Sequence, residues 1–190
     1  MYLPIYTYDH PVLKQKTKRV ANINDAVLSL AMNMMETMRH AHGIGLAANQ
    51  VGKSLSLTVV DISETDDNED VKPLVLINPE IIDVEGESIF EEGCLSLPGL
   101  REDVKRPSDI FFKYIDVNGK EITSEADGLL ARVIQHEIDH LNGIYFFERL
   151  SKLKQTLVKP ELNRIRKGDI ETDYELAPLP EKKRATAKAR

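Results

Sequence analysis

The chain has 190 residues, of which 42% are hydrophobic and 29% are charged, and its formal net charge at pH 7 is −6. This length suits a single domain with a substantial core, and the composition argues against wholesale disorder. The negative net charge argues against general nucleic-acid binding, so we expect no specific DNA binding.

No apolar run approaches the roughly 18–20 residues that a membrane span needs, so no membrane partner is expected. The start of the chain, Met1-Tyr2-Leu3-Pro4, lacks the basic and apolar regions of a signal peptide. Cys94 is the single cysteine and cannot form an internal disulfide, which is consistent with a reducing compartment. These features together predict a cytoplasmic protein.

A first helix is predicted from about Asn24 to His40. Asn24 is a suitable N-cap, Asp25 follows in the first turn, and Gly43 stops the pattern. Apolar residues recur at helical spacing, namely Val27, Leu30, Ala31, Met34, Met35 and Met38. The methionines indicate core packing rather than a cofactor pocket, because Met fills irregular gaps.

The middle of the chain is rich in β-branched residues and predicts strands. These strands are Leu55 to Asp61, Leu74 to Ile77, Ile81 to Val84, Ile110 to Ile115 and Glu121 to Thr123. Asn118-Gly119 is a strong hairpin signal between the last two. The acidic stretch Asp61 to Asp70 lacks the ligand spacing of a calcium loop, so we interpret it as a solvated, mobile loop.

A second helix is predicted to begin near Ser124, which stands three residues before Asp127, and to end at Asn142-Gly143. It is apolar on most of its surface, through Leu129, Leu130, Val133, Ile134, Ile138 and Leu141. Such a helix is typically buried at the centre of a domain.

His136 and His140 stand four apart on this helix, so both lie on one face and can bind one metal ion. Glu137 adjoins the first histidine, where it can move protons beside the ion. Buried polar groups need partners, and a metal supplies one. Asp139 is interpreted as a surface residue, with orientation of a ligand as the alternative.

A catalytic metal site usually has three protein ligands and an open position. Cys94 is the best candidate for the third ligand, and the alternative is a buried thiol that acts as a small hydrophobe. A further stretch, Gly43 to Gln50, indicates either close backbone approach to a ligand or tight packing. The amide of Gln50 can donate to a developing oxyanion.

The end of the chain predicts a short helix over Ser151 to Val158 and another from Pro160 to about Gly168. Residues 169–190 are predicted to form a flexible basic tail. A solvated tail is the favoured interpretation of its basic end, and contact with an RNA-rich partner, such as the ribosome, is the alternative.

Three stretches resemble peptide deformylases, in the order expected for that family. They are GxGLAAxQ at Gly43 to Gln50, EGCLS at Glu92 to Ser96, and QHExDHLxG at Gln135 to Gly143. The resemblance extends from the first residues to about residue 165. It implies a metal-dependent hydrolase that removes the formyl group from N-formylmethionyl nascent peptides and releases formate.

The fold implied by the resemblance is α+β, with antiparallel β-sheets wrapped around a central helix that carries the HExxH motif. A C-terminal helical segment follows, and residues 1–168 form a single catalytic domain.

The resemblance also assigns roles to residues. Cys94, His136 and His140 are implied as metal ligands, Glu137 as general acid/base, and the Gln50 side chain and Leu95 N–H as the oxyanion hole. The residues implied in substrate binding are Gly43, Ile44, Gly45, Arg101, Leu129 and Val133. Glu92 is implied as a partner of a ligand, and Arg132 stands where the family often has an apolar residue. One divalent ion is expected, Fe²⁺ in the cell, with Ni²⁺, Co²⁺ or Zn²⁺ able to replace it.

Three rival interpretations stay open. A zinc endopeptidase also uses His-Glu-x-x-His, but it would place its third ligand downstream, whereas Cys94 lies upstream. A structural zinc site in a binding module would need a fourth ligand, and His10, His40 and His42 show no suitable spacing. A cysteine nucleophile with a histidine base would work without a metal.

Overall fold

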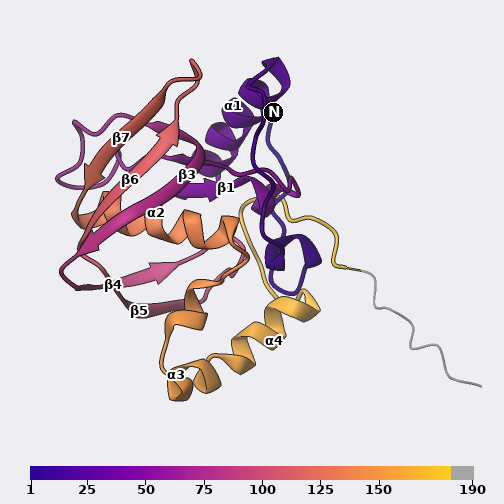
Figure 1. The fold of residues 1–190 in the computed structure, drawn as a ribbon. Helices are drawn as coiled ribbons and strands as arrows, with labels where there is room; N and C mark the ends of the chain where they lie inside the picture. Colours follow the sequence, from indigo (N-terminus) through magenta and orange to yellow (C-terminus); the bar gives the residue numbers. More distant parts are fainter. Residues whose placement is uncertain (181–190) are drawn as a thin grey trace, which may run out of the picture.

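Helix α2 (Gly128–Leu141) lies between two antiparallel sheets, and this arrangement organises the molecule (Figure 1). The computed structural model describes residues 1–180. On one side, α2 contacts four strands of the larger sheet, β1, β2, β3 and β6. On its other side α2 meets strands β4 and β5, where Arg132 donates to the carbonyl of Val104 at 2.9 Å. The predicted α+β fold with a central helix is confirmed.

The larger sheet has five strands in the order β1-β2-β3-β6-β7, all antiparallel. They are β1 (Gly45–Ala47), β2 (Leu57–Val60), β3 (Leu74–Glu85), β6 (Asp109–Ile115) and β7 (Glu121–Ala126). The smaller sheet pairs β4 (Ser88–Gly93) with β5 (Arg101–Arg106). Strands β1, β4 and β5 were not predicted, because β1 is very short and the other two carry many exposed charged side chains.

Strand β3 corrects the prediction of two separate strands between residues 74 and 84. It is one strand with register shifts near its middle, at the Asn78-Pro79 pair that interrupts the apolar pattern. Asn78 has a φ of +53°. Its side chain accepts from Val20 N at 2.8 Å and donates to Val20 O at 2.9 Å. These two bonds hold the irregular point of the strand against the N-terminal segment.

The predicted start of the second helix near Ser124 was wrong. Ser124 lies in β7, where it pairs with Phe112, and the ladder continues to Ala126 opposite Ile110. Helix α2 begins only at Gly128, with Asp127 as N-cap. Cross-strand pairing thus outweighs the capping signal that the sequence contains. The predicted turn at Asn118-Gly119 is confirmed between β6 and β7.

Helix α1 (Asp25–His40) begins as predicted, since the Asn24 side chain accepts from Val27 N at 3.1 Å. Met34 and Met38 are fully buried in a core cluster with residues of β1 and β2, which confirms core packing.

The prediction of a solvated loop for the acidic stretch after β2 is wrong at the first residue of that stretch. Asp61 is buried and accepts from Arg39 Nε at 2.8 Å, so it is a fixed ion-pair partner rather than part of a solvated loop.

Helices α3 (Lys152–Leu157) and α4 (Lys159–Lys167) confirm the two predicted C-terminal helices. The segment after them differs from the predicted flexible tail. Leu176 pairs with Ile5 in a parallel bridge, and Tyr174 donates to Leu95 O at 2.9 Å. Residues 174–177 therefore lie against the domain. The predicted basic end of the tail, residues 181–190, lies outside the described residues.

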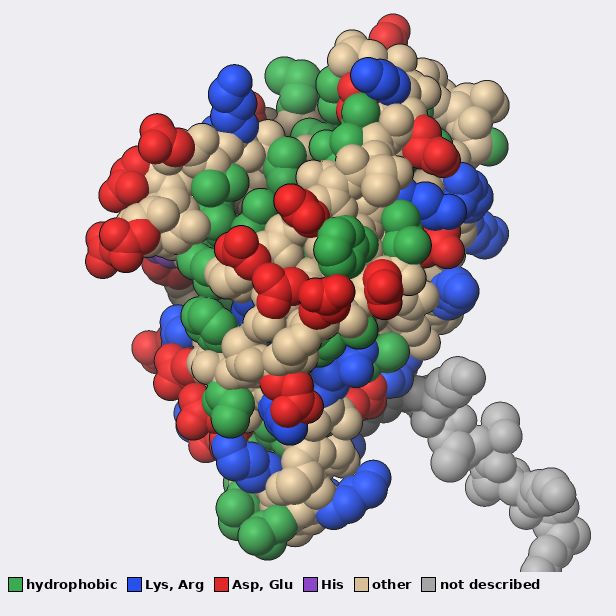
Figure 2. All heavy atoms as spheres, turned by 60° about the vertical axis from the view of Figure 1, so that its left-hand side comes forward, with side chains coloured by type: hydrophobic (Ala, Val, Ile, Leu, Met, Phe, Trp, Pro, Cys, Tyr) green, Lys and Arg blue, Asp and Glu red, His purple; other side chains and the backbone are tan. Residues whose placement is uncertain are grey.

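The surface in Figure 2 mixes acidic, basic and apolar side chains, and no continuous basic area covers the described residues on this face. Among residues 1–180, no helix has both the length and the apolar character that a membrane crossing requires.

Candidate active site

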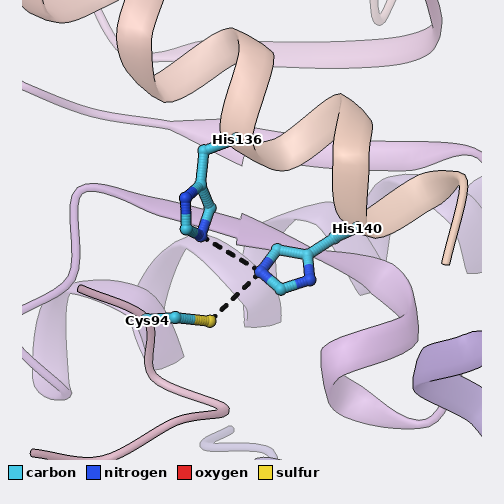
Figure 3. A group of neighbouring side chains, drawn as sticks. All are labelled: Cys94, His136 and His140. Atoms are coloured by element: carbon cyan, nitrogen blue, oxygen red, sulfur yellow. Dashed lines mark hydrogen bonds between the residues drawn. The ribbon is translucent and has the colours of Figure 1, made fainter. Parts of the chain in front are cut away.

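Helix α2 presents His136 and His140 on one face, toward the loop that follows β4 (Figure 3). Cys94, in that loop, points its thiol at them. The distance from Cys94 Sγ to His140 Nε2 is 3.1 Å, and the two Nε2 atoms are also 3.1 Å apart. Both histidines are buried, and Cys94 is half-buried. The three residues that the sequence singled out as ligands therefore converge in space.

The donor set fits one divalent transition-metal ion. The candidate ligand atoms of Cys94, His136 and His140 all lie within 4.8 Å of one another. A thiolate and two imidazoles suit Fe²⁺, Zn²⁺ and similar ions, whereas Ca²⁺ and Mg²⁺ require oxygen ligands. Among residues 1–180 this is the one cluster of three or more metal-ligating residues. A three-residue set leaves a coordination position open, as catalytic sites do.

Burial and neighbouring charges set the protonation of the two histidines. Burial lowers the pKa of His140 well below its ordinary value, and a charge on His136 lowers it further. Burial also opposes the charged form of His136, but hydrogen bonding to Cys94 and Glu92 outweighs it and raises the pKa of His136 to about 10. Metal binding at these ring nitrogens requires them to be unprotonated, so it would compete with protons for the site.

Glu137 stands beside this cluster with an unusual environment for a carboxylate. It is buried, and its Oε2 atom has no hydrogen-bond partner among residues 1–180. Burial raises the pKa of Glu137 to about 7, so the group can accept and release a proton near neutral pH. A Cβ at Gly45 would collide with this carboxylate and come within 2.8 Å of Val133, so only glycine leaves it room.

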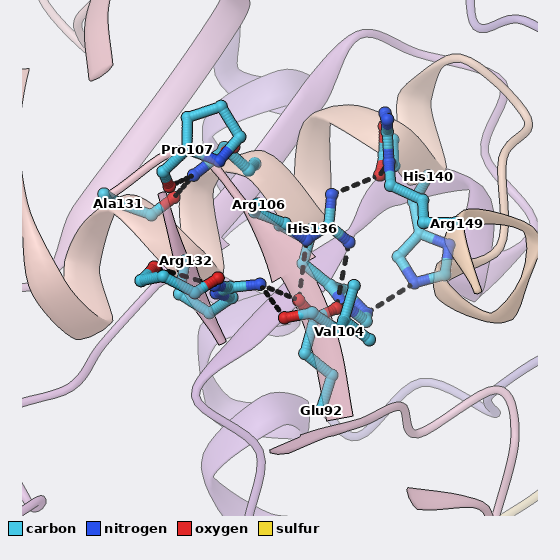
Figure 4. Close-up of polar contacts among 12 residues, drawn as sticks. Glu92, Val104, Arg106, Pro107, Ala131, Arg132, His136, His140 and Arg149 are labelled. Carbon is cyan, nitrogen blue, oxygen red and sulfur yellow. Dashed lines mark hydrogen bonds and ion pairs between the residues drawn. The ribbon is translucent and has the colours of Figure 1, made fainter. Parts of the chain in front are cut away.

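A buried ionic network lies behind His136 (Figure 4). Glu92 on β4 accepts from Arg106 Nε at 2.6 Å and from Arg132 at 2.8 Å, and it lies 2.9 Å from His136 Nδ1. Burial would raise the pKa of Glu92, but the bonds from Arg106 and His136 outweigh burial and hold it well below its ordinary value. Because Glu92 engages Nδ1, the Nε2 atom of His136 is free to face Cys94 and His140.

Asp139 belongs to the same network, which corrects its interpretation as a surface residue. It is buried and accepts from Arg106 at 2.6 Å and from Arg149 Nε at 2.6 Å. Sequence reasoning missed Arg106 and Arg149, because nothing in their spacing marks them as neighbours of Asp139. Arg106 therefore joins the two carboxylates, Glu92 and Asp139, across the back of the site.

Arg132, which stands where the family often has an apolar residue, is also part of this network. It is buried, and its guanidinium donates to Ser88 Oγ at 2.9 Å in addition to Glu92 and Val104. The ring of Phe90 lies 5.1 Å from its guanidinium carbon. The charge of Arg132 is thus satisfied by the β4–β5 hairpin, although the residue borders the pocket.

Cys94 and His136, two of the three candidate ligands, line a pocket of about 920 Å³, a size typical of small-molecule sites. The predicted site residues on its wall are Gly43, Ile44, Gly45, Gln50, Cys94, Leu95, Arg101, Leu129, Val133, His136 and Glu137. The wall also includes residues 171–174, which sequence reasoning placed in the tail. Those residues could not be found from sequence, because no motif marks them.

Gln50 and Leu95, which line this pocket, carry two N–H donors close to Cys94. The Gln50 side chain accepts from Ala47 N at 2.7 Å, which turns its Nε2 toward Ser96 Oγ at 3.1 Å and Cys94 Sγ at 3.5 Å. The Leu95 N–H has no acceptor among residues 1–180. Fixed donors of this kind can stabilise negative charge that develops on a substrate oxygen.

A buried set of three candidate metal ligands with an adjacent, weakly acidic carboxylate is typical of a metal-dependent hydrolase. Comparisons with known proteins give the family. The model of the polypeptide deformylase family matches residues 2–156. A peptide deformylase of Chlorobium phaeovibrioides is 52% identical over 177 residues, which cover 93% of this chain and 93% of that protein. This chain belongs to the polypeptide deformylase family, whose activity is removal of the N-formyl group from nascent peptides.

Solved structures agree with this assignment. The crystal structure of a peptide deformylase from Legionella pneumophila is 37% identical, with a TM-score of 0.80, and the match covers 89% of this chain and 98% of that one. The crystal structure of a peptide deformylase from Thermus thermophilus is 42% identical, with a TM-score of 0.79, and the match covers 87% of this chain and 98% of that one.

Proposed function

We propose that this chain hydrolyses the formyl group of N-formylmethionyl nascent peptides with one divalent metal ion, and that Glu137 is the general acid/base. The observation that carries this proposal is the unpartnered, buried Glu137 carboxylate beside the Cys94, His136 and His140 cluster. An ion held by these three residues would act as a Lewis acid and lower the pKa of water.

The chain's own residues then divide the proton transfers and charge stabilisation. Glu137 accepts a proton from the attacking water as its oxygen bonds to the formyl carbon. Gln50 Nε2 and Leu95 N–H donate to the formyl oxygen as it becomes negative, and each such donor contributes about 2.7–4 kcal/mol in known enzymes. Glu137 then gives the proton to the leaving nitrogen as the C–N bond breaks, which yields formate and a free amine.

The peptide chain is proposed to bind along β1, which is an edge strand of the larger sheet. Gly43, Ile44 and Gly45 line the pocket there, so their backbone groups can pair with an extended substrate. Ile44, Leu129 and Val133 would receive the methionine side chain. Arg101, which is exposed and lies 3.4 Å from Glu91, would contact the peptide further along.

Formate release from formyl-Met-Ala-Ser by anaerobically purified protein tests this function directly. We expect release before chelation of the metal, and loss of nearly all activity afterwards with recovery when a divalent ion is restored. Cleavage of an unformylated peptide would favour the endopeptidase alternative. Activity that survives complete metal removal would instead favour a cysteine nucleophile, and absence of release from folded, metal-loaded protein would favour a structural site.

Fe²⁺ is proposed as the metal in the cell, with Ni²⁺, Co²⁺ or Zn²⁺ able to replace it. Because a ferrous thiolate site is sensitive to oxidation, we expect the Fe²⁺ form to lose activity in air within a time over which the Ni²⁺ and Zn²⁺ forms stay active. Activity followed in parallel under air and argon measures this. Equal lifetimes of the Fe²⁺ form in the two gases would contradict it.

We also propose that the protein acts in the cytoplasm, where its nascent-peptide substrates are made. Contact of the basic end with the ribosome stays a hypothesis, and ribosome co-sedimentation of the protein with and without residues 182–190 would test it.

A further inference from the structure

The turn that carries Cys94 is held by segments from both ends of the chain. The turn Cys94–Leu97 is closed by a hydrogen bond of 2.9 Å from its last N–H to its first carbonyl. Its other two peptide carbonyls bond to distant residues. Ser96 O accepts from Tyr8 N at 3.0 Å, and Leu95 O accepts from the Tyr174 hydroxyl at 2.9 Å.

We name residues 171–177 the C-terminal strap. Its backbone is tied to the N-terminal segment, because Ile5 N donates to Glu175 O at 2.9 Å and Ala177 N donates to Ile5 O at 2.8 Å. In Figure 1 the yellow end of the chain accordingly runs beside the indigo N-terminal segment. The next residue, Tyr6, donates its N–H to Gln50 O at 2.7 Å. The strap is therefore connected to both proposed oxyanion-hole residues: directly to Leu95 through Tyr174, and to Gln50 through the Ile5-Tyr6 segment.

The strap lies outside residues 2–156, which match the family model. Nevertheless, residues 171–174 form part of the wall of the same pocket as Cys94 and Glu137. The strap thus contributes to the pocket from beyond the segment that the family model matches.

The geometry of a turn explains what Tyr174 does there. In a trans peptide the C=O and N–H groups point in opposite directions, so the closing bond that Cys94 O accepts aims the Leu95 N–H outward. The next peptide, between Leu95 and Ser96, is the central peptide of the turn, and its rotation distinguishes one turn type from another. The Tyr174 hydroxyl bonds the carbonyl of this central peptide and so fixes its orientation.

We propose that Tyr174 is a positioning residue for deformylation, which holds the Cys94–Leu97 turn so that the thiol and the Leu95 N–H face the pocket together. This inference rests on the proposed function, since it concerns the same oxyanion donor. A donor displaced by about 1 Å can cost on the order of 10²-fold in rate. Loss of one hydroxyl, with the other bonds of the turn kept, should displace the donor by less.

The test compares Tyr174→Phe with Tyr114→Phe, both measured as full-length, metal-loaded protein. Tyr114 lies on β6 outside the pocket wall, so its variant removes the same hydroxyl without touching the turn. We expect kcat for formyl-Met-Ala-Ser to fall about tenfold in Tyr174→Phe, with KM changed less than about twofold. Tyr114→Phe should keep both constants. Rates are expressed per bound metal ion, below the thermal unfolding midpoint of each variant.

Each outcome decides the proposal. A loss confined to kcat supports positioning of the oxyanion donor. An unchanged kcat, or a lower unfolding midpoint with kinetics equal to those of Tyr114→Phe, shows a structural role only and overturns it. A rise in KM with kcat preserved overturns it as well. If wild-type protein releases no formate, the proposed function fails instead, and this outcome is separate because it needs no variant.

Discussion

Replacement of Glu137 by alanine is expected to lower kcat for deformylation by about 10²–10⁴-fold while metal binding is retained. The side chain is buried beside the cluster but is not one of its three candidate ligands. Its loss removes the group proposed to carry the proton from water to the leaving nitrogen. Because its Oε2 atom has no partner among residues 1–180, truncation there should leave no strong hydrogen bond broken.

The measurement is kcat for formyl-Met-Ala-Ser together with metal content per chain. Glu121→Ala provides a control, since Glu121 is an exposed glutamate on β7 outside the pocket wall. Near-normal turnover in Glu137→Ala would refute the assigned role. Loss of the metal along with activity would instead mean that Glu137 supports the ligands rather than the proton transfer.

Replacement of Arg106 by methionine is expected to destabilise the fold by about 3–5 kcal/mol. Arg106 is buried and joins Glu92 and Asp139, with bonds of 2.6–2.9 Å to both. Without it, two carboxylates share the remaining charges of Arg132 and Arg149, and removal of one partner from a buried ionic network leaves charge uncompensated. A loss of this size is a large fraction of the roughly 5–15 kcal/mol that typically holds a domain folded.

Urea unfolding at pH 7 measures this effect for the metal-loaded protein. Lys105→Met is the matched control, because Lys105 is the neighbouring residue and its ion pair with Glu87 is exposed on both sides. Exposed pairs contribute about 0–1 kcal/mol, so this variant should be close to wild type. A change below about 1 kcal/mol in Arg106→Met would show that the network adds little to stability.

The central helix and its polar residues could be predicted because the information is local. The spacing of His136 and His140 is that of one helical turn, and the apolar residues around them indicate burial. Cys94 stood out as the single cysteine, and a resemblance carried by three motifs supplied the fold. Each of these signals lies within a few residues of the site it describes.

The rest depends on pairings that no local pattern records. Arg106 reaches Asp139 across 33 residues, and Tyr174 reaches Leu95 across 79. Ser124 has the residue pattern of a helix cap, but its pairing with Phe112 of β6 keeps it in strand β7. That pairing depends on a partner strand and so cannot be recognised from the residues around Ser124. The sequence therefore predicted which residues gather at the candidate site more readily than which residues hold them in place.

Because Ile5 pairs with residues 175–177, the N-terminal segment cannot make these contacts until the strap has been synthesised. A ribosome releases the N-terminal segment well before the C-terminal strap. Helix α2 and the Cys94 loop can therefore fold before the residue that bonds Leu95 has been translated. The part of the pocket wall that residues 171–174 form would be added only after the strap has been translated, so a growing copy of this chain would lack that wall until then.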